Sequence, residues 1–294
     1  MLTQNFPLNQ DQIERYSRQI LLKEIGGTGM RKLLDSTVGV IGAGGLGCPA
    51  IQVLAGAGVG HIKVIDGDRV EISNLPRQYL HFTSDIGEFK VDSVKKKVEA
   101  MNPDVKLETF RSFLTKENIK DFLTGCTAII EASDRIGTKF LVNDACVHFH
   151  IPFVVAGVVQ YYGQFLVVIP GETACYRCVF NEPIPEKLVP SCSGAGVLGS
   201  APALGGVLQA NEIIKTILGI KSGFPGHLFS FDLLKGAFDF ITLNRNTGCK
   251  ACANPDDPFY LSADYSPMND RCESTPDSEE LPNEMKYDYF SEYK

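Results

Sequence analysis

Hydrophobic and polar positions along the first half of the chain predict strands that alternate with helices. Five short apolar runs have the length of buried strands, at residues 37–41, 61–66, 105–110, 127–131 and 151–156. Four other segments have apolar residues at helical spacing or a helix-like composition, at residues 11–34, 46–57, 90–100 and 137–148. Strands that alternate with helices in this way predict an α/β fold with a mainly parallel sheet and right-handed crossovers.

The pattern changes in the second half of the chain. Three strand-like runs follow one another there, at residues 162–169, 227–234 and 237–243, with a helical segment at 203–218 between the first two. Lys235 and Gly236 separate the last two runs and predict a hairpin. We therefore expect antiparallel C-terminal strands to extend the same sheet within one domain, residues 1–253.

Residues 254–294 differ from this domain in composition. They contain eleven acidic and three basic residues, a net charge of 3 − 11 = −8 against −7 for the whole chain, and they are rich in Ser, Pro and Asn. This composition predicts a largely disordered tail.

The charge distribution and hydropathy of the chain argue against a nucleic-acid-binding protein and against a membrane-spanning protein. Nothing in the charge distribution suggests a nucleic-acid surface, which would need an extended cluster of Lys and Arg. No apolar run approaches about 18 residues, so no membrane span is expected. The N-terminus lacks the basic and apolar pattern of a secretory signal, which favours a cytoplasmic protein.

A glycine-rich loop, residues 42–47 (GAGGLG), lies between the first predicted strand and the next helix. Gly42, Gly44 and Gly45 allow a tight turn whose backbone N–H groups can approach a phosphate at the helix N-terminus. Asp66 ends the second predicted strand, 22 residues beyond Gly44, where a carboxylate can accept hydrogen bonds from ribose. The combination predicts a Rossmann-like nucleotide site, with NAD as the default ligand. The alternative is a turn that only packs helix on strand.

The polar segment that follows changes the expected ligand. It includes Asp68, Ser73, Asn74, Arg77 and Gln78, and Lys90 comes shortly afterwards. A dehydrogenase needs no pair of cations here, whereas phosphoryl or nucleotidyl transfer from a triphosphate does. Taken singly, Arg77 could form a surface salt bridge, and Lys90 could be a solvated helix start.

Asp134 follows the fourth predicted strand, at the edge of the sheet where ligands of such folds bind. A carboxylate beside a triphosphate usually holds Mg²⁺. The alternative is that Asp134 caps the helix that begins near Ile136.

Four of the nine cysteines form two CxxC pairs, Cys175 with Cys178 and Cys249 with Cys252. Each pair can direct two thiolates at one ion, so together they predict a structural Cys₄ zinc site. Unligated core cysteines or a redox pair are the alternatives. Cys192 lies apart from them in a small-residue loop. Its thiol could accept an acyl or persulfide group, or could simply be buried.

These motifs together resemble the MoeB/ThiF family, the bacterial relatives of ubiquitin-activating enzymes. The resemblance covers residues 12–253 and rests on an N-terminal RYSRQ, the glycine loop, a DxDxVxxSNLxRQ block, Gly87-x-x-Lys90, Ser133-Asp134-Arg135 and the CxxC pairs. Two positions depart from the family pattern: Arg135 stands where Asn is expected, and Lys139 where Arg is frequent.

The resemblance implies ATP-dependent adenylation of the C-terminal Gly-Gly carboxylate of a small ubiquitin-like sulfur carrier protein, with release of pyrophosphate. The residues that would line the ATP site are Gly42, Gly44, Gly45, Asp66, Asp68, Ser73, Asn74, Arg77, Gln78, Lys90, Asp134 and Arg135. Asp134 would bind Mg²⁺, and Arg77 and Lys90 would stabilise the phosphates. Arg18 would reach the ATP of the partner subunit in a homodimer, and in some relatives the cysteine that matches Cys192 forms a covalent link.

Two other functions stay open at this stage. An NAD-dependent oxidoreductase would need a catalytic acid or base, and none of the five histidines lies in a recognisable motif. A non-catalytic scaffold would not need Arg18, Arg77, Lys90 and Asp134. The sequence does not identify the carrier protein or its pathway.

Overall fold

The computed structural model describes residues 8–183 and 195–265. One eight-stranded sheet runs through the molecule in the order β3-β2-β1-β4-β5-β6-β7-β8. Its strands are β1 Thr37–Ile41, β2 His61–Ile65, β3 Lys106–Phe110, β4 Ala128–Glu131, β5 Phe153–Val159, β6 Tyr162–Val168, β7 His227–Asp232 and β8 Ala237–Thr242. The α-helices include α1 Gln10–Arg15, α2 Ser17–Ile20, α3 Gly26–Leu34, α4 Gly47–Ala57, α5 Lys90–Met101, α6 Ile119–Leu123, α7 Ile136–His148, α8 Tyr176–Val179, α10 Ser200–Leu218 and α11 Phe259–Ser262.

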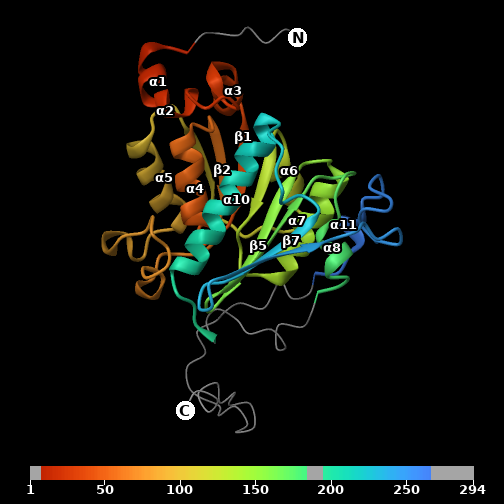
Figure 1. The fold of residues 1–294 in the computed structure, drawn as a ribbon. Coiled ribbons are helices and arrows are strands. Elements are labelled where there is room, and N and C mark those ends of the chain that lie inside the picture. The colour runs from red at the N-terminus through yellow and green to blue at the C-terminus, as the bar shows by residue number, and fades with distance from the viewer. Residues whose placement is uncertain (1–7, 184–194, 266–294) are drawn as a thin grey trace.

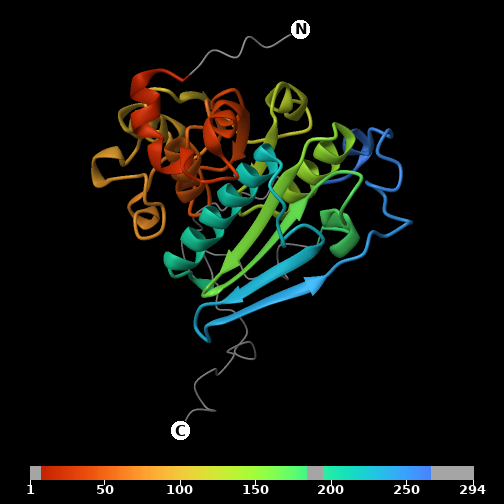
Figure 2. The ribbon, with the colours of Figure 1, turned by 45° about the horizontal axis from the view of Figure 1, so that its top comes forward.

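The predicted fold class is confirmed. Strands β3, β2, β1, β4 and β5 are mutually parallel, whereas β5 to β8 pair antiparallel and extend the same sheet. The hairpin expected around Lys235 and Gly236 joins β7 to β8, and Gly236 adopts a left-handed conformation with φ +66°. Figure 2 shows β7 and β8 at one edge of the sheet. The strand order places β3 at the opposite edge.

Helices cover both faces of the parallel half of the sheet because its strands are apolar on both sides. Val38 and Val40 of β1 pack with α3, α4, α5 and α10 in one core. Ile41 of β1 packs with α6, α7 and α11 in a second core on the other face. Figure 1 shows α4 and α10 side by side on the first face.

The N-terminal segment differs from the single helical stretch that the sequence predicted. It forms α1, α2 and α3, and the chain turns between them. Tyr16 separates the first two helices because its buried ring is tied through its hydroxyl to Asn102 and Asp104, at 3.3 and 3.1 Å. Gly26 begins α3 with φ +56°, a left-handed conformation that other residues rarely adopt.

The domain also extends beyond the boundary expected after residue 253. Tyr260 and Tyr265 are each only 4% exposed and pack against α7 and its neighbours. The Tyr265 hydroxyl donates to Asp144 Oδ2 at 2.5 Å, and the ring of His148 contacts the carbonyl of Pro255 at 2.9 Å. The polar composition of the whole tail concealed this short aromatic segment. The predicted disorder of residues 266–294 lies outside the described residues.

Truncation tests this corrected boundary. A chain that ends after Pro255 loses two buried tyrosines, which we expect to cost about 3 kcal/mol or more. Its melting temperature should therefore fall by roughly 6–12 °C. A chain that ends after Tyr265 should melt within about 2 °C of the full-length protein. Equal melting temperatures for the two truncations would contradict the packing of residues 256–265.

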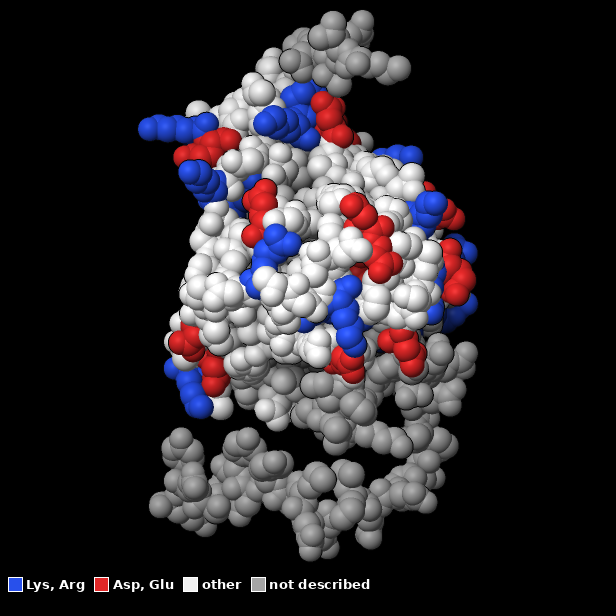
Figure 3. Space-filling model, turned by 90° about the vertical axis from the view of Figure 1, so that its right-hand side faces the viewer, with Lys and Arg blue, Asp and Glu red and all other residues white. Residues whose placement is uncertain are grey.

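Surface properties add two observations. Among the described helices, none combines the length and apolar character needed to cross a bilayer. The face drawn in Figure 3 carries positive and negative side chains interspersed with one another.

Candidate active site and metal centre

The strand order reverses beside β1, which has β2 on one side and β4 on the other. In open parallel sheets of this kind the carboxyl ends of the strands form a ligand-binding crevice at that point. The glycine loop follows β1, the polar segment with Asp66 follows β2, and Asp134 follows β4. The topology thus brings three segments that the sequence singled out to one edge of the sheet.

The glycine loop is too tightly packed for side chains at two of its positions. Gly42 has φ +96°, and a Cβ there would lie 2.9 Å from the carbonyl oxygen of Ala132. A Cβ on Gly47 would lie 1.9 Å from the carbonyl oxygen of Gly42. Gly44 is open by comparison, since its nearest neighbour would be Gln78 Nε2 at 3.7 Å. The tight turn leads directly into the N-terminus of α4.

Asp66 holds this loop to the end of β2. Its Oδ2 accepts the backbone N–H of Ala43 at 2.7 Å, and its Oδ1 accepts that of Asp68 at 2.8 Å. Burial raises the pKa of Asp66, against the opposing effect of the Lys90 charge and the two N–H donors. The carboxylate expected to bind ribose therefore already holds the glycine loop to the segment after β2. Its oxygens keep further lone pairs with which to accept hydrogen bonds from a ligand.

His81 also holds the glycine loop in place, and no sequence motif pointed to it. Its Nε2 lies 2.9 Å from the Ala43 carbonyl oxygen and its Nδ1 lies 2.9 Å from Ser93 Oγ. Burial lowers the pKa of His81. Because a carbonyl only accepts, Nε2 donates to Ala43, while Ser93 Oγ also donates to Asp85 Oδ2 at 3.0 Å. With both nitrogens engaged, His81 is not available as the proton donor of an oxidoreductase.

Lys90 lies in the same crevice and is only 7% exposed. Its Nζ donates to Asp68 Oδ2 at 2.8 Å. Burial alone would lower the pKa of Lys90, but the carboxylates of Asp66, Asp68 and Asp134 outweigh it and raise the pKa. The alternative of a solvated helix start is therefore wrong, and a buried positive charge lies beside the glycine loop.

Arg77 lies at the rim, where its Nη1 donates to the carbonyl oxygen of Ser73 at 2.8 Å. It forms no salt bridge within residues 8–183 and 195–265, so the salt-bridge alternative finds no support. The backbone carbonyl oxygen of Arg77 would lie 3.5 Å from a Cβ placed on Gly45. Asn74 accepts the backbone N–H of Glu71 at 3.1 Å and shapes this turn.

Gln78 is only 3% exposed and faces Gly44. In the described part of the chain its Oε1 has no hydrogen-bond partner. A buried acceptor without a donor is costly, and such groups commonly await a ligand or water.

Asp134 is exposed at the end of β4. The N-cap residue of α7 is Arg135, and no side chain caps this helix, so Asp134 does not have the capping role that the sequence left open. The Arg135 guanidinium lies 3.8 Å from the centre of the Phe113 ring. Phe113 in turn packs against Gly67 after β2, so Arg135 ties the two loops together.

Arg18 is not brought to this crevice. It is exposed on α2, and its neighbour Gln19 donates to the carbonyl of Gly56 at 3.5 Å, in the last turn of α4. Helix α4 has 11 residues and is therefore about 16 Å long, and the glycine loop lies at its other end. Figure 1 shows α2 at the end of the sheet where the parallel strands begin.

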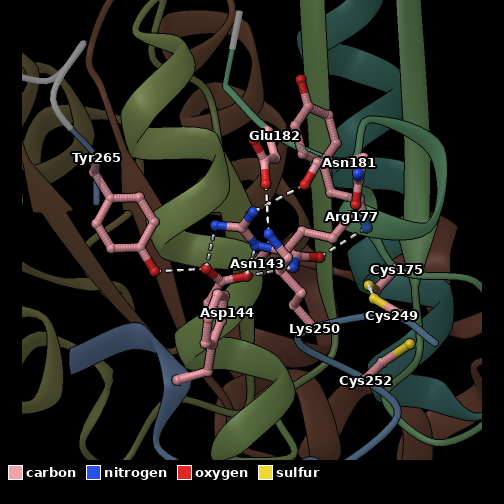
Figure 4. A network of polar contacts seen from close by, with 12 residues as sticks. Asn143, Asp144, Cys175, Arg177, Asn181, Glu182, Cys249, Lys250, Cys252 and Tyr265 are labelled. Atoms are coloured by element: carbon pink, nitrogen blue, oxygen red, sulfur yellow. Dashed lines mark hydrogen bonds and ion pairs between the residues drawn. The ribbon is translucent and has the colours of Figure 1, made fainter. Parts of the chain in front are cut away.

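The two CxxC pairs meet in one cluster whose four sulfur atoms lie within 4.8 Å of one another. Figure 4 labels three of these cysteines, Cys175, Cys249 and Cys252. Cys175 Sγ lies 3.8 Å from Cys178 Sγ and 3.5 Å from Cys249 Sγ, and the Sγ atoms of Cys178 and Cys252 are 3.4 Å apart. Thiolates around a tetrahedral zinc are about 3.8 Å apart, given Zn–S bonds of about 2.3 Å. The backbone N–H of Asn246 donates to Cys178 Sγ at 3.4 Å, as expected beside a thiolate. The cluster fits a metal ion.

A buried ion pair next to the cluster fastens it to the domain, as Figure 4 shows. Arg177, between the two cysteines of the first pair, binds Asp144 with both Nε and Nη2, at 2.7 and 2.8 Å. Tyr265 and Asn143 also donate to Asp144. The first pair is thus fixed to α7, whose other end lies beside Asp134. Cys192 lies outside the described residues.

Comparisons with known proteins agree with this architecture. A model of the ThiF family matches residues 16–251. The sulfur carrier protein adenylyltransferase of Thermus thermophilus is 42% identical over 250 residues, 83% of this chain and 92% of the relative. The SAMP-activating enzyme E1 of Haloferax volcanii is 39% identical over 245 residues, 83% of this chain and 90% of the relative.

Two further matches are partial or more distant. The adenylyltransferase and sulfurtransferase MOCS3 of Culex quinquefasciatus is 42% identical over 248 residues, 84% of this chain but only 57% of the relative. The crystal structure of Escherichia coli MccB with ATP has a TM-score of 0.73 over 82% of this chain and 75% of the other, at 24% identity, and shares the fold. The family match spans the sheet, the glycine loop and both cysteine pairs, and with it the chain belongs to the ThiF family.

Proposed function

We propose that this chain adenylates the C-terminal Gly-Gly carboxylate of a small ubiquitin-like protein at the expense of ATP. One observation carries the proposal: a buried cation, Lys90, lies beside a glycine loop at the switch point of the sheet, with the exposed carboxylate Asp134 nearby. The similarity to a sulfur carrier protein adenylyltransferase and to an E1 enzyme supports it.

The arrangement suits attack on the α-phosphate. A carboxylate oxygen of the carrier bonds to the α-phosphorus, the bond from that phosphorus to the bridging oxygen breaks, and pyrophosphate leaves with the electron pair. Lys90 and Arg77 stabilise the negative charge that develops on the phosphates. The loop backbone, held by Asp66 and His81 at Ala43, offers N–H groups that are already oriented.

Asp134 is the residue that would hold Mg²⁺, since it is an exposed carboxylate with no capping role beside the phosphate site. The ion would neutralise charge on the triphosphate and the departing pyrophosphate. The four clustered cysteines would hold a structural Zn²⁺. Cys192 would take part only after adenylation. Its thiolate would attack the acyl carbon of the adenylate to form a thioester as AMP leaves, or would take the outer sulfur of a donor persulfide whose inner sulfur leaves as a thiolate. The reaction would take place in the cytoplasm.

Exchange of labelled pyrophosphate into ATP tests this function. We expect exchange to require Mg²⁺ and a ubiquitin-like protein that ends in Gly-Gly, and to disappear when that protein lacks its last glycine. Candidate carriers are the Gly-Gly-ending proteins encoded in the same genome. Calorimetry should detect ATP binding and no NADH binding. Binding of NADH without binding of ATP would instead favour an oxidoreductase.

We further propose that the active site is shared across a homodimer, with Arg18 acting on the partner's ATP. Arg18 lies about one helix length from the glycine loop of its own chain and has no polar partner among residues 8–183 and 195–265. A two-fold axis would place the α2 surface of one subunit over the crevice of the other.

Mixing two inactive variants tests this arrangement. Arg18→Ala and Asp134→Ala chains are each expected to lack exchange activity. If Arg18 acts in trans, a mixed dimer collects both lesions in one site and leaves the other intact. Random reassortment then makes about half of the dimers mixed, so roughly a quarter of wild-type exchange should return. Mixed dimers, verified by two affinity tags, that stay inactive would refute the trans arrangement.

A further inference from the structure

A second buried charge pair lies behind Asp134. Glu131 ends β4 and is 0% exposed, and Lys139 reaches it from the first turns of α7, with Nζ and Oε2 2.5 Å apart. Burying two charges costs free energy unless every donor and acceptor is satisfied. A buried pair beside the proposed nucleotide crevice therefore calls for a role.

Lys139 uses all three of its N–H groups. One goes to Glu131, and the others go to the carbonyl oxygens of Ser133 and Ala156, each at 2.7 Å. Two of the three hydrogen bonds therefore go to backbone carbonyl groups, one just after β4 and one within β5. A pair that served stability alone would not need to contact the loop.

Ser133, the residue before Asp134, is held at every polar atom. Its N–H donates to Glu131 Oε1 at 3.0 Å, its hydroxyl donates to the same oxygen, and its carbonyl accepts from Lys139. Gln209 of α10 also fixes the strand end, because its Nε2 donates to the Glu131 carbonyl at 2.7 Å.

The residue after Asp134 is fixed as well, since Arg135 lies on the Phe113 ring. Asp134 itself is exposed. Among the described residues Asp134 has no hydrogen-bond partner, so the loop presents this carboxylate from a backbone that is held on both sides.

We propose that Lys139 is a positioning residue that, through Glu131 and Ser133, fixes Asp134 in the geometry needed to hold a divalent cation on the nucleotide. This inference rests on the proposed function. Groups that orient a metal ligand without touching the metal typically change metal affinity or activity about 10- to 100-fold when they are removed. The pair should therefore control the Mg²⁺ requirement more than the binding of the nucleotide itself.

The test is the double variant Glu131→Gln/Lys139→Met, which removes both charges and leaves neither unpaired. The Mg²⁺ concentration for half-maximal pyrophosphate exchange should rise about 10-fold or more. Calorimetry should show ATP binding without Mg²⁺ within about twofold of wild type, while the added affinity from Mg²⁺ is lost. The single variant Lys139→Arg keeps the charge and the N–H donors, and should retain most of the wild-type Mg²⁺ response.

The matched control is Glu212→Gln/Lys215→Met, which removes another pair whose carboxylate is buried, on α10. It should leave the Mg²⁺ response unchanged whatever it does to the melting temperature. A folded Glu131→Gln/Lys139→Met chain with the wild-type Mg²⁺ response would overturn the inference. If that chain does not fold, Ser133→Ala gives the same readout, and an unaltered Mg²⁺ response would again overturn it.

The two proposals fail differently. Wild-type protein that shows no exchange with any Gly-Gly-ending carrier refutes the proposed function. Wild-type exchange, combined with a normal Mg²⁺ response in the variants, refutes only the role of Lys139.

Discussion

Lys90→Met is expected to lower the rate of carrier-dependent pyrophosphate exchange by about 10²- to 10³-fold, the usual effect of removing one fixed charge or donor from a transition state. Methionine keeps the length of the side chain but not its charge. Lys90 is buried, so water cannot substitute fully for its ammonium group. The fold should persist, because Asp66 keeps its two backbone N–H donors.

Lys96→Met is the matched control on the same helix. Lys96 pairs with Glu88 at the surface, with Nζ 2.7 Å from the carboxylate, and its side chain is 61% exposed. Its loss should change exchange by less than about twofold. Exchange rates are compared at saturating Mg²⁺ and carrier, with melting temperatures measured in parallel. A Lys90→Met protein that keeps near wild-type exchange would remove Lys90 from the proposed chemistry.

The second large effect concerns the cysteine cluster. Cys249→Ser should abolish bound zinc, measured by elemental analysis as a fall from one ion per chain to nearly none. Because a structural zinc contributes directly to folding, the stability should drop by at least about 4 kcal/mol. For a chain of this size the melting temperature should fall by roughly 10 °C or more. A strong chelator should act in the same direction on the wild-type protein.

The matched control, Cys126→Ser, distinguishes the effect of losing zinc from the effect of losing a cysteine elsewhere. Cys126 is a partly buried thiol outside the cluster that contacts the Phe122 carbonyl at 3.4 Å. This variant should retain one zinc per chain. A metal-free wild-type protein that melts at the same temperature as the zinc-loaded protein would show that the cluster is held by packing and by the Arg177–Asp144 pair alone.

The zinc site could be predicted in part from the sequence alone. The spacing within each CxxC already specifies two thiolates on one turn. That the two pairs meet across 74 residues depends on the antiparallel strands that bring the chain back. The support from Arg177 and Asp144 had no local signal, because the two residues are 33 positions apart.

The packing of the domain continues past residue 253 for a related reason. Composition averages over a segment, and residues 254–294 as a whole are acidic and polar. Tyr260 and Tyr265 are buried because a surface on α7 is available to them, which only the packed domain provides.

The sequence by itself determined the order of strands and helices, the parallel sheet, the glycine loop and the carboxylates and cations around it, because these follow from short-range periodicity and residue type. Only the tertiary structure decided that Lys90 is buried against Asp68, that Asp134 is free of a capping role, and that Arg18 lies at the far end of its own domain. The contacts made by His81, Glu131 and Lys139 became visible only there as well. Burial, pKa and hydrogen-bond partners depend on side chains from distant segments, and no local pattern in a sequence encodes which of those segments will meet.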